Sequence, residues 1–139
     1  MKKGLARRSV DTSPLIYSKD FYDWPDRWMG FDEDLTTGKT ILKGFLPFIK
    51  FLIEREFSKR TIKNHMNNLW LLGSEIIRGV HADENHQTLS PKALLLEYIN
   101  EDGGPWVQQW DPNDSLDEGA CNSYEATCRK LFQFLIMEK

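Results

Sequence analysis

Apolar side chains between residues 45 and 77 recur at intervals of three and four positions, which is the spacing of one face of an α-helix. Ser58 divides this pattern into two parts, and its hydroxyl is well suited to cap a helix that begins at residue 59. The pattern therefore predicts two amphipathic helices joined by a tight turn. Their apolar faces contain Phe45, Ile49, Leu52 and Ile53 before the turn and Ile62, Leu69, Leu72, Ile76 and Ile77 after it.

The bounds of this helical pair follow from the residues near its ends. Thr36 or Thr37 is expected to cap the first helix. Pro47 removes one backbone hydrogen bond, so we expect this helix either to begin near Gly44 or to bend at the proline. The second helix is predicted over residues 59–78, because a glycine follows it.

Two further helices are predicted later in the chain. Ser90 followed by Pro91 is a typical helix start, because serine caps the helix and proline fits its first position. This helix is short, since Gly103 and Pro105 cannot continue it. The last helix is expected to open at Ser115, and its apolar positions are Tyr124, Cys128, Leu131, Phe132 and Leu135. No stretch alternates as a strand would, so the predicted fold class is all-α, with four helices in one bundle.

The first 34 residues have neither the helical nor the strand period, and they include Pro14, Pro25 and Gly30. We therefore interpret residues 1–34 as an extended amino-terminal arm and residues 35–139 as the helical domain. Aromatic side chains crowd this arm, at Tyr17, Phe21, Tyr22, Trp24, Trp28 and Phe31. The arm either packs across the helices and completes their core, or docks onto another subunit or partner. Under the second interpretation the candidate docking residues are Tyr17, Phe21, Tyr22, Trp24 and Trp28.

Charge is unevenly distributed along the chain. The 139 residues, enough for one domain with its own core, carry 18 basic and 21 acidic side chains, for a net charge of −3. Residues 11–34 contain seven acids against two bases, and residues 81–118 contain nine acids against one base. Residues 35–80, between these acidic segments, contain eight bases against three acids. A uniformly basic surface is therefore excluded, but a local basic surface on the first two helices is predicted.

Several functional classes are disfavoured by what the chain contains. Cys121 and Cys128 lie seven positions apart on one predicted helix, about 10 Å by helical rise, which is too far for a disulfide. Two reduced thiols, the lack of an apolar run long enough to span a membrane and the lack of a secretion signal favour a soluble cytoplasmic protein. No catalytic motif is present, and we expect neither enzymatic activity nor a cofactor.

Three groups of chemically capable residues favour a structural interpretation. The loop at residues 81–86 contains two histidines and two acids but lacks the fixed spacing of a metal site, so we interpret it as a solvated acidic loop. Cys121 and Cys128 fall on the apolar face of their helix and are interpreted as core thiols. His65 lies beside the apolar stripe of the second helix, where hydrogen-bonded packing is expected.

The start of the second helix has the strongest chemical signal. Lys59, Arg60 and Lys63 lie in its first turns, although a helix amino terminus carries about half a positive charge and favours acids there. Free backbone amides and cations converge at this point, which is the chemistry of a phosphate site. The other interpretation is an ordinary solvated surface whose charge Glu54 and Glu56 neutralise.

The segment FLPFIKFLIEREFSKRTIKNHMNNLWLLG, residues 45–73, resembles the amino-terminal core-binding domain of tyrosine recombinases and phage integrases. That domain has a helix ending in F-L-x-x-L, a short turn, the pattern S-x-x-T with an aliphatic residue, and a leucine-bearing helix. The matching positions here are Ser58, Thr61, Ile62, Leu69 and Leu72. The segment NSYEATCRKLFQFLI is similar to the fourth helix of that domain, with Leu131, Phe132, Phe134 and Leu135 as its apolar signature. The resemblance covers about residues 38–138.

The resemblance implies a four-helix, SAM-like orthogonal bundle that holds DNA from one side, with its second and fourth helices facing the duplex. It implies DNA contacts at Lys59, Arg60, Thr61, Lys63 and Asn64 and, on the fourth helix, at Asn122, Ser123 and Thr127. The catalytic half of the family, with its arginine, lysine, histidine and tyrosine constellation, has no room in this chain. His65 stands where the family often has tyrosine.

We therefore expect a stand-alone, non-catalytic DNA-binding module of a mobile element or prophage, associated with the nucleoid in the bacterial cytoplasm. Duplex DNA is the expected partner, contacted at its backbone. The alternative is a protein-interaction or regulatory module that does not bind DNA. Such a module would use the aromatic arm or the acidic loop to dock a recombinase, a second copy of itself or another regulator. Neither expectation involves a membrane or a small-molecule substrate.

Overall fold

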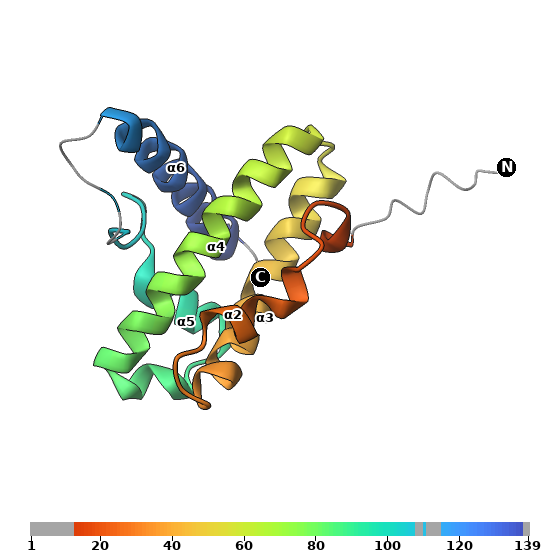
Figure 1. The fold of residues 1–139 in the computed structure, drawn as a ribbon. Helices are drawn as coiled ribbons and strands as arrows, with labels where there is room; N and C mark the ends of the chain where they lie inside the picture. The colour runs from red at the N-terminus through yellow and green to blue at the C-terminus, as the bar shows by residue number, and fades with distance from the viewer. Residues whose placement is uncertain (1–12, 108–109, 111–114, 138–139) are drawn as a thin grey trace, which may run out of the picture.

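A computed structural model describes residues 13–107, 110 and 115–137 of the chain, and every regular element in this part is helical (Figure 1). The described residues form no strand, and their only β-type pairing is an isolated bridge between Asn100 and Gly103. The all-α class predicted from the sequence is therefore confirmed. The α-helices are α2 (Trp24–Trp28), α3 (Asp34–Glu54), α4 (Lys59–Ala82), α5 (Pro91–Tyr98) and α6 (Ser115–Met137), and the 3₁₀ turns are η1 (Pro14–Ile16), η2 (Phe21–Asp23) and η3 (Glu84–Thr88).

Helices α3 and α4 lie side by side and are joined by a tight turn (Figure 1). Ser58 caps α4 as predicted, because its hydroxyl oxygen accepts the backbone N–H of Thr61 at 3.1 Å. Helix α3 ends in a Schellman arrangement, in which the N–H of Phe57 bonds the carbonyl of Leu52 at 3.3 Å. Glu56 occupies the left-handed position of this turn, at φ 61°.

The start of α3 differs from the predicted cap at Thr36 or Thr37, because the helix begins at Asp34. The Asp34 carboxylate accepts the backbone N–H groups of Gly30 and Phe31, at 2.8 and 2.9 Å, and so organises the chain that enters the helix. The helix also continues through Pro47, so of the two alternatives at this proline the start near Gly44 is wrong. Pro47 lies on the exposed face of α3, where its ring faces solvent.

The second and third predicted helices are present, but α4 is longer than expected. It continues past Gly79 to Ala82, because this glycine is a packing position and does not end the helix. A Cβ atom at residue 79 would overlap the ring of Tyr98 on α5. Helix α5 has the predicted start, since Ser90 accepts the N–H of Ala93 at 3.3 Å.

One hydrophobic core joins α3, α4, α5 and α6. Each buried Leu, Ile or Phe side chain contributes about 1.5–3 kcal/mol relative to exposure, which is enough to hold the helices together. The fully buried members with the largest side chains include Phe45, Phe48, Ile49 and Leu52 on α3, Ile62, Leu69, Leu72 and Ile76 on α4, and Tyr124 on α6.

The amino-terminal segment is not extended, which corrects the sequence-based prediction for residues 13–34. It forms η1, η2 and α2, and its Phe21 and Trp24 side chains are 0% and 3% exposed within the common core. The Trp28 indole N–H donates to the carbonyl of Trp70 at 3.2 Å. The interpretation of this segment as a strap that completes the helical core is therefore confirmed. Residues 1–12 of the predicted arm lie outside the described residues.

Candidate functional site

The basic cluster, which we define as Lys59, Arg60 and Lys63, lies at the amino end of α4. All three side chains are exposed. None of the ion pairs found among the described residues includes them, so Glu54 and Glu56 do not neutralise the cluster through direct contacts. The first backbone N–H groups of a helix also lack partners within the helix. Ser58 caps the Thr61 N–H, whereas the N–H groups of residues 59 and 60 have no partner among the described residues, so these two donors and the cations are available together at this helix end.

Two other predicted contact residues lie in the same turns of α4. Asn64 follows Lys63 and is exposed. Thr61 is half-buried, and its hydroxyl oxygen accepts a hydrogen bond from the Ser58 hydroxyl at 2.9 Å. Thr61 therefore takes part in the helix cap, whereas Asn64 extends the polar surface of the basic cluster.

The predicted contact residues on α6 do not join the basic cluster. Asn122 and Ser123 are exposed, but the amide nitrogen of Asn68 donates to the Ser123 hydroxyl at 3.0 Å. Asn68 lies nine residues beyond Lys59 along α4, or about 13 Å by helical rise. Ser123 therefore lies beside the middle of α4.

Thr127 is only 1% exposed, which is a correction to its predicted role as a DNA contact. Its hydroxyl lies 2.7 Å from Nδ1 of His65 and accepts the amide of Asn68 at 2.8 Å. Burial, with a smaller effect from the Lys130 charge, lowers the pKa of His65. The predicted packing role of His65 is confirmed, and Thr127 belongs to the same internal polar contact between α4 and α6.

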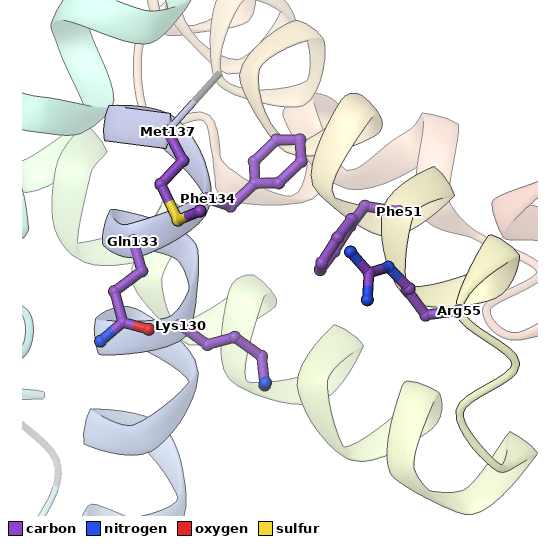
Figure 2. A pocket seen from close by; sticks show the side chains of 6 residues that line it. All are labelled: Phe51, Arg55, Lys130, Gln133, Phe134 and Met137. Carbon is purple, nitrogen blue, oxygen red and sulfur yellow. The ribbon is translucent and has the colours of Figure 1, made fainter.

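A groove of about 320 Å³ lies between α3 and α6 and close to the turn that precedes the basic cluster (Figure 2). Its two cationic groups each lie over an aromatic ring: the Arg55 guanidinium is 5.0 Å from the centre of Phe51, and the Lys130 ammonium is 5.1 Å from the centre of Phe57. We name it the aromatic–basic groove. It is lined by Phe51, Arg55, Lys130, Gln133, Phe134 and Met137.

Sequence reasoning did not assign Arg55, Phe51 or Phe134 to a site. The available signal was local: Arg55, the carboxy-terminal cap of α3, follows Phe51 by four residues, and Lys130 and Phe134 are four apart on α6. Each pair therefore places a cation and a ring on one helix face. Their meeting across a groove depends on how α3 and α6 pack, which the local pattern does not contain.

The five candidate docking residues have different environments. Phe21 and Trp24 are buried in the core of their own chain, so they are not available to a partner, and this corrects their predicted role. Tyr17 and Trp28 are half-buried, whereas Tyr22 is 53% exposed. Tyr22 lines a second, mostly apolar groove of about 290 Å³ together with Phe21, Pro25, Lys39, Leu42, Lys43 and Leu46.

The two histidines of the predicted acidic loop have defined partners. His81 Nε2 lies 2.6 Å from the buried carboxylate of Asp34. His86 Nδ1 lies 2.7 Å from the Tyr98 hydroxyl, and its Nε2 lies 3.3 Å from Glu97. Residues 81–85 are exposed, as the solvated-loop interpretation predicts, but His81 belongs to α4 and both histidines have defined side-chain partners. No group of three His, Cys, Asp or Glu residues in the described part of the chain is arranged to hold a metal ion.

The cysteines differ in burial. Cys128 is buried, and burial raises the pKa of its thiol to about 12, which disfavours the thiolate needed for nucleophilic chemistry. Cys121 is only partly buried, so the core interpretation holds fully for Cys128 alone. Burial also raises the pKa of Cys121.

Comparison of the chain with family models, with curated proteins and with solved structures finds no match. No helix in the described ranges has both the length and the apolar character that a membrane span requires. The chemistry of the basic cluster and of the aromatic–basic groove is therefore the basis for a functional proposal.

Proposed function

We propose that the chain is a non-catalytic module that binds the backbone of duplex DNA through the basic cluster at the start of α4. The observation that carries this proposal is the exposure of Lys59, Arg60 and Lys63 without carboxylate partners at a helix amino terminus. Lys59 and Arg60, in the first turn, each forgo the roughly 0.3–1 kcal/mol that an acid would gain from the helix dipole. A phosphate bound at this point removes that local conflict, because it pairs with the cations and accepts from the free amides.

The resemblance of residues 38–138 to the integrase core-binding domain supports the same proposal. Our proposal also includes a SAM-like arrangement of the bundle and a role in a bacterial mobile element. The proposed contact set is Lys59, Arg60, Lys63 and Asn64, with Thr61 holding the cap. Asn122 is a peripheral contact, since Ser123 beside it lies against the middle of α4. Phosphate contacts position a protein on DNA without reading its sequence.

Fluorescence anisotropy with a labelled blunt duplex between about 50 and 200 mM salt tests the proposal. Three neutralised phosphates predict a slope of about −2.7 for log affinity against log salt concentration. The variant with Lys59, Arg60 and Lys63 all changed to Glu is expected to lose this binding. Its fold is expected to be retained, because acids favour the first turn of a helix.

The matched control changes the exposed α3 residues Lys39, Lys43 and Lys50 to Glu, which alters net charge by the same amount elsewhere. This control is expected to keep most of the affinity for the duplex. Equal losses in both triple variants would locate the interaction outside the basic cluster. Absence of binding by the unmodified protein at low salt would refute the proposal.

A second candidate function, docking of a protein partner, is favoured by the groove of about 290 Å³ beside exposed Tyr22. Sedimentation velocity of the unmodified chain and of Tyr22→Asp tests this candidate, with a recombinase or the chain itself as the partner. Loss of association in the variant, with unchanged helical content, supports docking. Deletion of residues 1–34 is unsuitable, because Phe21 and Trp24 would leave the core.

A further inference from the structure

We propose that the aromatic–basic groove binds an unpaired nucleotide, at a strand end or in a single-stranded extension of the DNA held by the basic cluster. This inference rests on the proposed function and names a second, chemically different part of the nucleic acid as its ligand. The groove lies between α3 and α6, and Figure 2 shows the side chains of the two helices facing each other across it.

The charge of the groove favours an anion. Arg55 and Lys130 line it, and among the described residues no carboxylate lines it and neither cation takes part in an ion pair. The pairing of each cation with an aromatic ring also holds the two charges in place. A phosphodiester that follows the groove would therefore meet two positioned cations.

The rest of the lining favours a flat, partly apolar group. Phe51 and Phe134 have their ring centres 5.1 Å apart, and Arg55 presents a planar guanidinium over Phe51. Unpaired bases stack on aromatic rings and on guanidinium planes. Met137, at the edge of the groove, is 77% exposed and provides apolar contact surface for such a base.

Gln133 makes a nucleotide a better match than an acidic peptide. Its exposed amide can both donate and accept hydrogen bonds, as the edge of an unpaired base requires. A side-chain carboxylate would use only donors. The volume of about 320 Å³ lies at the lower end of the roughly 300–1,000 Å³ typical of small-ligand sites, which suits one nucleotide and not a folded peptide segment.

The groove and the basic cluster both border the turn between α3 and α4. Arg55 is four residues before Lys59, and the Lys130 ammonium lies over Phe57, which directly precedes the Ser58 cap. A strand whose phosphates lie on the basic cluster can therefore direct its unpaired end over this turn and into the groove.

Anisotropy with three labelled probes tests the inference: a blunt duplex, the same duplex with a short single-stranded thymidine extension, and the extension strand alone. Stacking of a single base predicts that the extended duplex binds about 5- to 150-fold more tightly than the blunt duplex. In the double variant Arg55→Gln and Phe134→Leu, the affinities for the extended and the blunt duplex are expected to be equal. This variant removes a cation and a ring and retains apolar volume at residue 134.

The affinity ratio separates this inference from the proposed function. If the groove does not bind a nucleotide, the protein still binds the blunt duplex, and the affinity ratio is either near one in the unmodified protein or unchanged in the double variant. If backbone binding by the basic cluster is wrong, the blunt duplex does not bind, whereas the single strand binds in a manner that depends on Arg55 and Phe134. Binding of an acidic peptide in the groove, without binding of the single strand, would also overturn the inference. The Lys50→Gln and Leu46→Met pair on α3 is the matched control and is expected to keep the ratio.

Discussion

The hydroxyl of Thr127 on α6 lies 2.7 Å from Nδ1 of His65 on α4, at a point where the threonine side chain is 1% exposed. The amide of Asn68 donates to the same hydroxyl at 2.8 Å, so one buried oxygen has partners on two successive turns of α4. Burying polar groups is tolerated when they are hydrogen-bonded. This contact therefore specifies the register between α4 and α6, because sliding either helix would separate the partners.

The change Thr127→Val preserves the shape of the side chain and removes its hydroxyl. The Asn68 amide then loses one of its acceptors and keeps those on Ser123, and His65 loses its partner at Nδ1. We expect the free energy of unfolding to fall by about 1–3 kcal/mol. Urea denaturation followed by circular dichroism measures this change.

The control for this experiment is Thr127→Ser, which keeps the hydroxyl and is expected to lose less stability than the valine variant. A valine variant as stable as the unmodified protein would show that the contact between His65 and Thr127 does not stabilise the fold.

Protonation of His65 is expected to make stability depend on pH. Because burial and the Lys130 charge lower the pKa of His65 in the folded state, the unfolded chain binds more protons below its ordinary pKa of about 6.5. The histidine contribution is therefore complete above about pH 6.5 and is lost as pH falls through the folded-state pKa. The slope contributed by one proton cannot exceed about 1.4 kcal/mol per pH unit.

The change His65→Asn isolates this contribution, because the difference between the two proteins cancels the contributions that they share. The free energy of unfolding is measured from pH 7.5 to about pH 5 for both proteins. Parallel curves over this range would contradict the prediction. A shallower fall in the asparagine variant would support it.

Replacement of Glu56 by glycine is expected to stabilise the protein. Its φ of 61° is costly for a residue with a Cβ atom, by about 1–2 kcal/mol, and glycine avoids this cost at the price of some chain entropy. We expect Glu56→Gly to raise the unfolding free energy by about 1 kcal/mol. The control Glu56→Ala removes the charge but keeps the Cβ atom, so an equal gain in both variants would assign the effect to charge.

Replacement of Gly73 on α4 by alanine is expected to destabilise the protein. Alanine favours a helix interior by about 1 kcal/mol, but a Cβ atom here would overlap the ring of Trp28. Overpacking costs about 1–3 kcal/mol, and displacement of Trp28 also breaks its hydrogen bond to the Trp70 carbonyl. We therefore expect Gly73→Ala to lower the thermal midpoint.

The matched control is Gly119→Ala on α6, where a Cβ atom meets nothing within 4 Å. It is expected to raise the midpoint through helix propensity alone. If both glycine variants shift the midpoint in the same direction, the packing of Trp28 against α4 does not have the energetic role inferred from its position.

The parts of the fold that could be predicted depend on neighbouring residues. The caps at Ser58 and Ser90 are short-range features, since each serine bonds the N–H three residues ahead. The end of α4 could not be read in this way, because Gly79 meets Tyr98 from another helix. From the local sequence alone, Gly79 looks like a residue that ends a helix.

The candidate site shows the same division. The basic cluster was identified from the sequence, since its cations follow one cap within a few residues. Thr127 was misassigned although it lies three residues after buried Tyr124 and four before buried Leu131, which is the spacing of the apolar face of α6. The burial of Phe21 and Trp24 depends on contacts with helices far along the chain. Local periodicity does not contain that information.

The indole rings of Trp24, Trp28 and Trp70 lie with their centres 5.5–5.7 Å apart where the amino-terminal strap meets α4. Trp110 lies instead against Tyr124 of α6, with Trp106 beside it. The molecule therefore contains two separate optical reporters. Replacing Trp106 and Trp110 by phenylalanine would leave an emission spectrum that follows detachment of the strap, independently of the loss of helix observed by circular dichroism.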